Sequence, residues 1–314
     1  MRRLTVAVLI TGGTGFLGAE VARLLVDEDG EHPVLFDLFP DHNAVANLSG
    51  DVTVVAGDFA EPAELVDVMT KHDIEGIFHL GYFTAAAELY PSQASRVNAL
   101  GTTRVFELAH SMGVRRVVWP SSAAVYGHAE TTPTPQWRTE QEVPSPNSVY
   151  GACKLFNEHV AEVMAARHGF DHVGLRLCSV FGPRRAGRRG IAPDFYATVL
   201  EATRRGEPVT APPANHVLTW GYVKDAARAF RAAFLADAPP SRIYNFAGPS
   251  ATAEAAGEFV RRAVPGADIR YGESGLRHLA YLDAASIKDD LGFEPHYTME
   301  EAMTDYLAAS TPTT

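Results

Sequence analysis

Hydrophobic residues in the first 180 positions form short continuous runs that alternate with longer segments of helical periodicity. Continuous apolar runs of this length are typical of strands buried on both faces of a sheet. Because strands alternate with helices, we expect an α/β fold with a doubly wound parallel sheet, a Rossmann fold, whose right-handed crossovers place helices on both faces. The strands are expected at Thr5–Ile10, Pro33–Asp37, Val52–Ala56, Gly76–Leu80, Val114–Pro120 and His172–Leu177, and the helices at Leu17–Glu28, Pro62–Lys71, Pro91–Met112 and Tyr150–His168.

The pattern changes after Leu177, where no linker separates the later segments from the sheet. We therefore expect a smaller C-terminal lobe that interleaves with the last elements of the sheet. Residues 1–178 are assigned to the sheet domain, with 219–248 returning to it, and residues 179–218 and 249–309 to the lobe. The expected elements are helices at Pro193–Arg205, Tyr222–Ala236, Thr252–Val264 and Met299–Ala309, a strand at Ile243–Phe246, and loops at Phe181–Gly190 and Pro208–Asn215.

Composition narrows the class of protein. The chain has 314 residues, of which 46% are hydrophobic, enough for a full core. A net charge of −11 argues against a nucleic-acid-binding surface. No apolar run approaches the roughly 20 residues that span a bilayer, and the short run before the first glycine turn does not fit a signal peptide. Cys153 and Cys178 make neither a disulfide framework nor a metal motif, so we expect a cytoplasmic protein without a bound metal.

A glycine-rich turn follows the first predicted strand and opens a predicted helix. Gly12 allows a tight turn, Gly15 lets the backbone approach a pyrophosphate, and Gly18 lets the helix pack closely on the strand. The helix N-terminus, at Phe16 and Leu17, offers N–H groups and the positive end of the helix dipole to phosphates. The turn therefore predicts a dinucleotide site.

Acidic residues at two strand ends indicate which dinucleotide binds. Asp37 ends the second predicted strand, where a carboxylate accepts hydrogen bonds from ribose hydroxyls and repels a 2′-phosphate. Leu38–Pro40 supply no basic residue that would welcome that phosphate, so NAD is favoured over NADP. Asp58, followed by Phe59 after the third strand, is a candidate for hydrogen bonding to the adenine amino group.

Tyr150 and Lys154 are the candidate catalytic pair. Their i, i+4 spacing places them on one face of a helix. A nearby ammonium stabilises a phenolate and lowers the pKa of the phenol, so the pair can move a proton to or from a substrate oxygen. Ser122 lies at the end of the fifth predicted strand, the edge where ligands bind in this fold, and its hydroxyl can polarise the same oxygen.

With these motifs the chain resembles the extended short-chain dehydrogenase/reductase family, of the sugar-nucleotide epimerase/dehydratase type. The resemblance covers nearly the whole chain, and its motifs occur in the family's order. They are the glycine turn, Asp37, Asp58, His79-Leu80-Gly81, Val97–Thr102, Ser121–Gly127, Tyr150–Lys154, Leu175-Arg176-Leu177, Phe181-Gly182-Pro183 and Val223–Ala227.

The resemblance implies roles for individual residues. Tyr150 is the expected acid/base, Lys154 its partner and Ser122 the hydroxyl donor, while Asn98 is expected to order the active site and cofactor. Tyr126 is expected either to gate the substrate or to pack beside Ser122. The expected cofactor contacts are Gly12, Gly15, Phe16, Leu17, Gly18, Asp37, Asp58, Phe59, Leu80, Asn98, Tyr150 and Lys154.

The chain departs from the family in three places. Family dehydratases carry Thr and an Asp-Glu pair where this chain has Ser122–Ala124, so a 4,6-dehydratase is not expected. The arginine that contacts the diphosphate in UDP-sugar epimerases is matched by Leu218. The asparagine after the Leu-Arg-Leu strand is replaced by Cys178 or Ser179. The last two changes weaken the interpretation as a nucleotide-sugar enzyme.

Other residues are candidates for the substrate pocket. A cluster of four arginines between 184 and 189 either binds a phosphate or carboxylate or is a solvated loop. Aromatic side chains predict a more apolar pocket as the alternative. The candidate substrate contacts are Phe83, Tyr126, Ser179, Arg184, Arg185 and Trp220.

These observations predict an NAD-dependent enzyme that transfers a hydride at a secondary alcohol or ketone. The leading substrate is a sugar or sugar nucleotide, handled by an epimerase or a dehydrogenase. The alternatives are a dehydrogenase or ketoreductase of a non-nucleotide small molecule, and a non-catalytic dinucleotide sensor. In the family, helices matching Pro91–Met112 and Tyr150–His168 pair between subunits, which predicts a homodimer.

Overall fold

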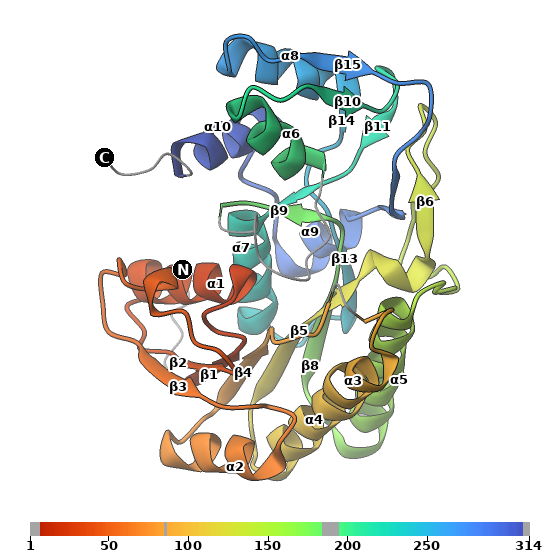
Figure 1. Cartoon of the computed structure of the whole chain (residues 1–314). Coiled ribbons are helices and arrows are strands. Elements are labelled where there is room, and N and C mark those ends of the chain that lie inside the picture. Colours follow the sequence, from red (N-terminus) through yellow and green to blue (C-terminus); the bar gives the residue numbers. More distant parts are fainter. Residues whose placement is uncertain (1–6, 85–86, 184–194, 310–314) are drawn as a thin grey trace.

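A seven-stranded parallel sheet forms the centre of the computed structural model, which describes residues 7–84, 87–183 and 195–309 (Figure 1). Its strand order is β13-β8-β5-β4-β1-β2-β3, so the chain reverses direction across the sheet between β1 and β4. This confirms the predicted doubly wound sheet. The strands are β1 (Val8–Thr11), β2 (Val34–Asp37), β3 (Thr53–Ala56), β4 (Gly76–His79), β5 (Arg116–Ser122), β8 (His172–Leu177) and β13 (Ile243–Phe246).

Helices cover both faces of the sheet because successive apolar strand residues point to opposite sides. Ile10 and Phe78 pack on one face, and their neighbours Leu9 and Ile77 pack on the other. The first face is covered by α1 (Phe16–Leu24), the π-helical turn η1 (Leu25–Asp29), α7 (Val223–Leu235) and α9 (Ala285–Leu291), and the second by α2 (Pro62–Lys71), α3 (Pro91–Ala94), the π-helical segment η3 (Ser95–Gly101), α4 (Thr102–Ser111) and α5 (Val149–His168).

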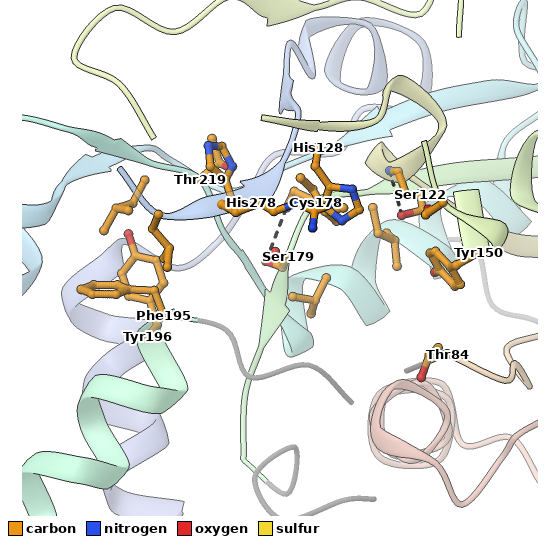
Figure 2. A pocket seen from close by; sticks show the side chains of 18 of the residues that line it. Thr84, Ser122, His128, Tyr150, Cys178, Ser179, Phe195, Tyr196, Thr219 and His278 are labelled. Atoms are coloured by element: carbon orange, nitrogen blue, oxygen red, sulfur yellow. Dashed lines mark hydrogen bonds between the residues drawn. The ribbon is translucent and has the colours of Figure 1, made fainter. Parts of the chain in front are cut away.

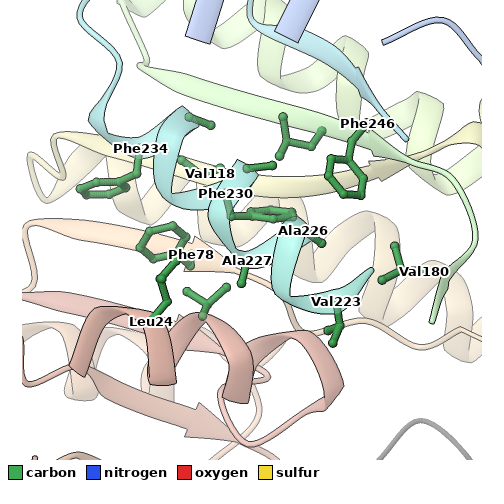
Figure 3. Packing of buried hydrophobic residues seen from close by; sticks show 14 of the residues in the cluster. Leu24, Phe78, Val118, Val180, Val223, Ala226, Ala227, Phe230, Phe234 and Phe246 are labelled. Atoms are coloured by element: carbon green, nitrogen blue, oxygen red, sulfur yellow. The ribbon is translucent and has the colours of Figure 1, made fainter. Parts of the chain in front are cut away.

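Helix α7 is anchored between α1 and the sheet by aromatic side chains (Figure 3). Phe230 and Phe234 are almost completely buried, and Phe234 stacks on Phe78 of β4 with ring centroids 4.9 Å apart. Burial of each phenyl group contributes about 1.5–3 kcal/mol of transfer free energy. This packing fixes α7 on the sheet, although α7 follows residues 179–218 of the predicted lobe in the sequence.

A second hydrophobic core holds the C-terminal lobe together, above the sheet in Figure 1. It contains the helices α6 (Phe195–Arg204), α8 (Ala253–Ala263) and α10 (Met299–Ala309). Short strand pairs join the lobe to the rest. These are β9 (Val180–Phe181) with β12 (Gly221–Tyr222), β6 (His128–Glu130) with β16 (Arg277–Leu279), and β7 (Trp137–Arg138) with β17 (Tyr281–Leu282). Two further pairs lie within the lobe, β10 (Val209–Ala211) with β15 (Ile269–Tyr271) and β11 (Val217–Leu218) with β14 (Ala251–Thr252).

Several predicted boundaries were wrong. The fifth strand extends past Pro120 to Ser122, because Ser121 and Ser122 hydrogen-bond within the protein and can be buried. The helix predicted over Pro91–Met112 contains the π-helical segment η3 in its middle. The predicted loop at Pro208–Asn215 contains β10, which pairs in parallel with β15.

None of the helices in the described ranges combines the length and apolar composition that a membrane span requires.

Candidate active site

The glycine turn lies where β1 ends and α1 begins, next to the point at which the sheet order reverses. Gly12 has a φ of +64°, and a Cβ there would lie 2.8 Å from the backbone of Gly81. A Cβ on Gly18 would lie 2.1 Å from the Gly12 carbonyl oxygen. Gly15 caps α1 without a side-chain hydrogen bond, and Phe16 and Leu17 follow it. Only glycine fits at two of these positions, and the backbone they permit is the cradle that a pyrophosphate requires.

Asp37 ends β2 and faces the glycine turn. Its carboxylate accepts hydrogen bonds from the Thr14 amide at 3.2 Å, the Thr14 hydroxyl at 2.8 Å and the Phe39 amide at 3.3 Å. The carboxylate is thus held in position beside the glycine turn. These residues fit an NAD molecule, whose pyrophosphate would be held by Gly12–Gly18 and whose adenosine ribose would be held by Asp37.

Asp58 follows β3 and is paired with Arg96, whose guanidinium lies 2.7 Å from its carboxylate. The backbone amide of Ala60 donates to the same carboxylate at 2.9 Å. Phe59 packs edge-on against His79 with ring centroids 4.8 Å apart. Burial lowers the pKa of His79 to about 3, so the imidazole is neutral in the folded protein.

Asn98 lies in η3 and fastens the segment that follows β4. Its side-chain amide donates to the Phe83 carbonyl oxygen at 2.7 Å, and its carbonyl oxygen accepts from the Phe83 amide at 2.8 Å. Leu80, at the start of this segment, donates its amide to the Thr11 carbonyl oxygen at 3.0 Å. The two contacts hold residues 80–83 between the glycine turn and the helices.

Ser122 and Tyr150 come together because α5 packs closely on the 3₁₀ turn η4 (Ala123–Tyr126). Ser122 caps this turn, and its hydroxyl oxygen accepts from the Ala124 amide at 3.1 Å. Helix α5 begins after Ser148, whose hydroxyl accepts from the Gly151 amide at 3.0 Å. Tyr150 therefore lies in the first turn of α5, and both side chains reach the same cavity.

Lys154 lies one turn after Tyr150 and is buried, with 1% of its surface exposed. Its ammonium donates to the Pro120 carbonyl oxygen and lies 5.5 Å from the centroid of the Tyr150 ring. Burial lowers the pKa of Lys154 well below its usual value, while the neighbouring Cys153 and Glu158 oppose the shift. The Lys154 nitrogen therefore lies buried next to the phenol of Tyr150.

A cavity of about 520 Å³ opens between the sheet edge and the lobe (Figure 2). Tyr150 and Ser122 lie at one end, and Phe195 and Tyr196 of α6 lie at the other. The cavity is lined by Phe16, Leu17, Thr84, Glu88, Ser122, Ala124, His128, Thr131, Ser148, Tyr150, Leu177, Cys178, Ser179, Val180, Phe195, Tyr196, Leu218, Thr219, Leu276, Arg277, His278 and Leu279.

The structure places one of the candidate substrate residues in the cavity wall and places others outside it. Ser179 lines the cavity, whereas Phe83 is outside its wall. Tyr126 is not in the wall either, because its hydroxyl donates to the Thr139 carbonyl oxygen at 2.8 Å and accepts from Arg176. Trp220 does not line the cavity, since its indole is buried in the lobe core against Phe181 and Tyr196. Arg184, Arg185, Arg188 and Arg189 lie outside the described residues.

The sequence did not reveal several residues of the cavity wall. Glu88 accepts a hydrogen bond from the Tyr150 amide at 3.3 Å, and His128 and His278 come from the two strands of the β6–β16 ribbon. Burial lowers the pKa of His278. The sequence marks these wall residues only as charged or aromatic positions in segments without a clear periodic pattern. Many surface residues have the same property, so it does not identify a site.

Comparison with known proteins identifies the family. A family model described as the NAD dependent epimerase/dehydratase family matches residues 8–247. A UDP-glucose 4-epimerase of Azospirillum brasilense is 32% identical over 189 residues, which cover 59% of this chain and 52% of the relative. A dTDP-glucose 4,6-dehydratase of Streptomyces niveus is 27% identical over 324 residues, which cover 95% of this chain and 90% of the relative.

Solved structures show the same similarity in three dimensions. The holo form of a GalE-like L-threonine dehydrogenase from Cupriavidus necator superposes with a TM-score of 0.80 at 28% identity, over 96% of this chain and 99% of that chain. The family match and the fold confirm the predicted class of enzyme and its NAD cofactor. The chain therefore belongs to the NAD-dependent epimerase/dehydratase family, within the extended short-chain dehydrogenases/reductases, and it is an NAD-dependent enzyme.

Proposed function

We propose that this enzyme oxidises a secondary alcohol, or reduces the corresponding ketone, with Ser122, Tyr150 and Lys154 as its catalytic group. The observation that carries the proposal is the position of Tyr150 and Ser122 in one cavity whose wall also contains Phe16 and Leu17, which lie between Gly15 and Gly18 of the glycine turn. A substrate in this cavity lies between the hydroxyl groups and the dinucleotide site. The volume of about 520 Å³ is in the usual range for small-molecule sites.

The chain's own residues move the proton. The Lys154 ammonium favours the phenolate of Tyr150, which accepts the proton of the substrate hydroxyl as the carbon–oxygen double bond forms. Ser122 donates a hydrogen bond to the same oxygen. When bound, NAD supplies the acceptor for the hydride that leaves the substrate carbon, and NADH supplies the hydride in the reverse direction.

We propose a sugar or sugar nucleotide as the substrate, with epimerisation or dehydrogenation as the net reaction. Support comes from the family match and from the relatives, since the Azospirillum brasilense protein is named a UDP-glucose 4-epimerase. The match covers about half the length of that relative, so its activity is carried over only as a proposal.

A second candidate is net dehydrogenation of a small alcohol without a nucleotide. Leu218, which stands where the family has its arginine, lines the cavity, and so do Cys178 and Ser179, one of which stands where the family has its asparagine. The apolar side chain of Leu218 cannot make the charge-assisted contact to a diphosphate that the arginine makes. A charge-assisted contact to phosphate contributes about 1.5–3 kcal/mol. The Cupriavidus necator structure, titled an L-threonine dehydrogenase, is an example of this fold with a small substrate in its name.

The test of the catalytic assignment is Tyr150→Phe, which removes the proton-transferring hydroxyl. UDP-sugars, free sugars and hydroxy acids are first screened to find a substrate of the wild-type enzyme. We expect the variant to lose at least a hundredfold in kcat, because general acid–base catalysis contributes about 10²–10⁴-fold. Tyr90→Phe is the matched control, since Tyr90 is 61% exposed and outside the cavity wall. Unchanged turnover in Tyr150→Phe contradicts the assignment.

Cofactor analysis separates the two candidate reactions. Denatured protein is examined by absorbance and mass spectrometry for dinucleotide that survived purification. Retained NAD supports an epimerase, which returns the hydride to its own substrate. Freely exchanging NAD supports a dehydrogenase.

A further inference from the structure

Tyr82 lies directly against the Lys154 ammonium. The Lys154 Nζ atom is 3.1 Å from the centroid of the Tyr82 ring, closer than the 5.5 Å to the Tyr150 ring. The Tyr82 and Tyr150 rings meet edge to face with their centroids 5.8 Å apart. One aromatic side chain therefore touches both members of the candidate catalytic pair.

The Tyr82 ring is fixed in place by its hydroxyl group. Asn157 donates to this hydroxyl at 2.6 Å, and the hydroxyl donates to the Asn98 carbonyl oxygen at 3.3 Å. The Asn157 amide also donates to the same Asn98 carbonyl at 2.8 Å. Asn157 is fully buried and lies one helical turn after Lys154. The hydroxyl of Tyr82 thus ties the ring to α5 and to η3 at the same time.

Among the residues that the structure describes, few opposite charges lie near Lys154. Glu158 lies one turn away on α5, but both of its oxygens accept hydrogen bonds from the Arg176 guanidinium, at 2.9 and 2.8 Å. Cys153 is a buried thiol on the same helix, and burial raises its pKa. His79 at the end of β4 is neutral, with a pKa of about 3. The buried ammonium therefore depends on the Pro120 carbonyl oxygen and the face of the Tyr82 ring.

We propose that Tyr82 is a positioning residue whose ring face holds the Lys154 ammonium in its charged form beside Tyr150. A desolvated cation over an aromatic face is attracted by the ring quadrupole. Loss of that face leaves the ammonium buried without this partner, so it becomes neutral or moves away. In either case the phenolate of Tyr150 loses stabilisation. The inference rests on the proposed roles of Tyr150 and Lys154 and adds a residue that the catalytic motif does not contain.

The experiment measures the pKa of the Tyr150 phenol in the purified full chain by NMR of tyrosine labelled with carbon-13 at Cζ. The Tyr150→Phe variant identifies the signal. Tyr82→Leu removes the ring, Tyr82→Phe keeps the ring without its hydroxyl, and Lys154→Met removes the charge. Fluorinated phenylalanines at position 82 keep the shape and weaken the ring quadrupole step by step, so a conclusion remains available if Tyr82→Leu does not fold.

We expect the Tyr150 pKa to rise by about one unit in Tyr82→Leu, to rise progressively with fluorination, and to rise least in Tyr82→Phe, which keeps the ring face but loses the hydroxyl bonds that hold it. If the Tyr150 pKa rises in Lys154→Met but is unchanged by Tyr82→Leu and by fluorination, the role of Tyr82 is wrong and the catalytic pair stands. If the pKa is ordinary in the wild type and unchanged in Lys154→Met, the proposed function of the pair is itself wrong.

Discussion

At the scale of single residues, we expect Asp37 at the end of β2 to set the preference for NAD over NADP. The carboxylate of Asp37 is already held by Thr14 and by the Phe39 amide, so its charge is oriented before any ligand arrives. A preorganised acceptor gives up less entropy on binding than a mobile one. The same fixed charge repels a 2′-phosphate and cannot turn away from it at low cost.

We predict that Asp37→Asn changes the preference between NAD and NADP. The amide keeps an acceptor for Thr14 but removes the negative charge, so the ratio of the NADP and NAD dissociation constants should shift toward NADP by about tenfold or more. Titration calorimetry with each dinucleotide measures both constants. The control is Asp51→Asn, at an exposed position distant from the turn in the sequence. An unchanged ratio contradicts the role of Asp37.

Which site residues could be predicted depends on how local their signals are. Some candidates could be found because they form a local motif at the end of a predicted strand or at the start of a predicted helix. These are the glycine turn, Asp37 and the Tyr150–Lys154 pair. Tyr82 and Glu88 contact residues of α5 that lie about 60–70 positions further along the chain. Their partners are set by tertiary packing, which the pattern around them does not encode.

At the scale of elements, the active site depends on how closely α5 approaches η4. Gly151 lies between Tyr150 and the rest of the helix, and a Cβ there would lie 2.4 Å from the Ala124 carbonyl oxygen. Because this contact is with backbone, it cannot be relieved by a side-chain rotation. The glycine therefore sets the separation between the elements that carry Tyr150 and Ser122.

We predict that Gly151→Ala pushes α5 away from η4 and impairs catalysis. Turnover of the identified substrate should fall by at least tenfold, and the free energy of unfolding by about 1–3 kcal/mol, as for other overpacked contacts. Steady-state kinetics and urea unfolding measure the two effects. Ala152→Ser is the control, because it adds one atom to the neighbouring exposed position. Wild-type kinetics in Gly151→Ala would contradict the argument.

Element types were predictable, but their details were not. The π-helical segment η3 shifts backbone hydrogen bonds by one residue, a change that leaves little trace in hydrophobic spacing. The extension of β5 to Ser122 was missed because serine is polar. Its neighbour Ser121 is buried only because its hydroxyl donates to Glu158 at 2.5 Å, a contact made on another element.

At the scale of the molecule, apolar residues remain exposed on the helices η3 and α5, which pack against each other. Leu100, Phe156 and Val163 are 46%, 48% and 52% exposed. Apolar side chains that gather on neighbouring helices are typical of interaction surfaces. They support the predicted homodimer.

We predict that the purified protein is a dimer at micromolar concentration and that Phe156→Glu combined with Val163→Glu makes it monomeric. Charged side chains in an apolar interface would have to be buried without partners. Sedimentation equilibrium measures the mass. Val143→Glu is the control, since Val143 is 88% exposed but lies before α5. A wild-type monomer, or a double variant that remains dimeric, contradicts this interface.

The fold class was predictable because the alternation of strands and helices is repeated along more than half of the chain. The strand pairs that join the lobe to the sheet could not be predicted from the sequence. They contain two or three residues on each side, which is too short for a periodic pattern. The assignment of 179–218 and 249–309 to a separate lobe remains a prediction.

The cavity wall has a consequence for recombining this enzyme with its relatives. Besides the first helix, its residues come from six stretches, within 84–88, 122–131, 148–150, 177–180, 195–219 and 276–279. A chimera that exchanges one contiguous segment of sequence with a relative therefore has a cavity wall composed of residues from two enzymes. These side chains were not selected to fit each other. We therefore expect that substrate preference is transferred to a relative only when all six stretches are exchanged together.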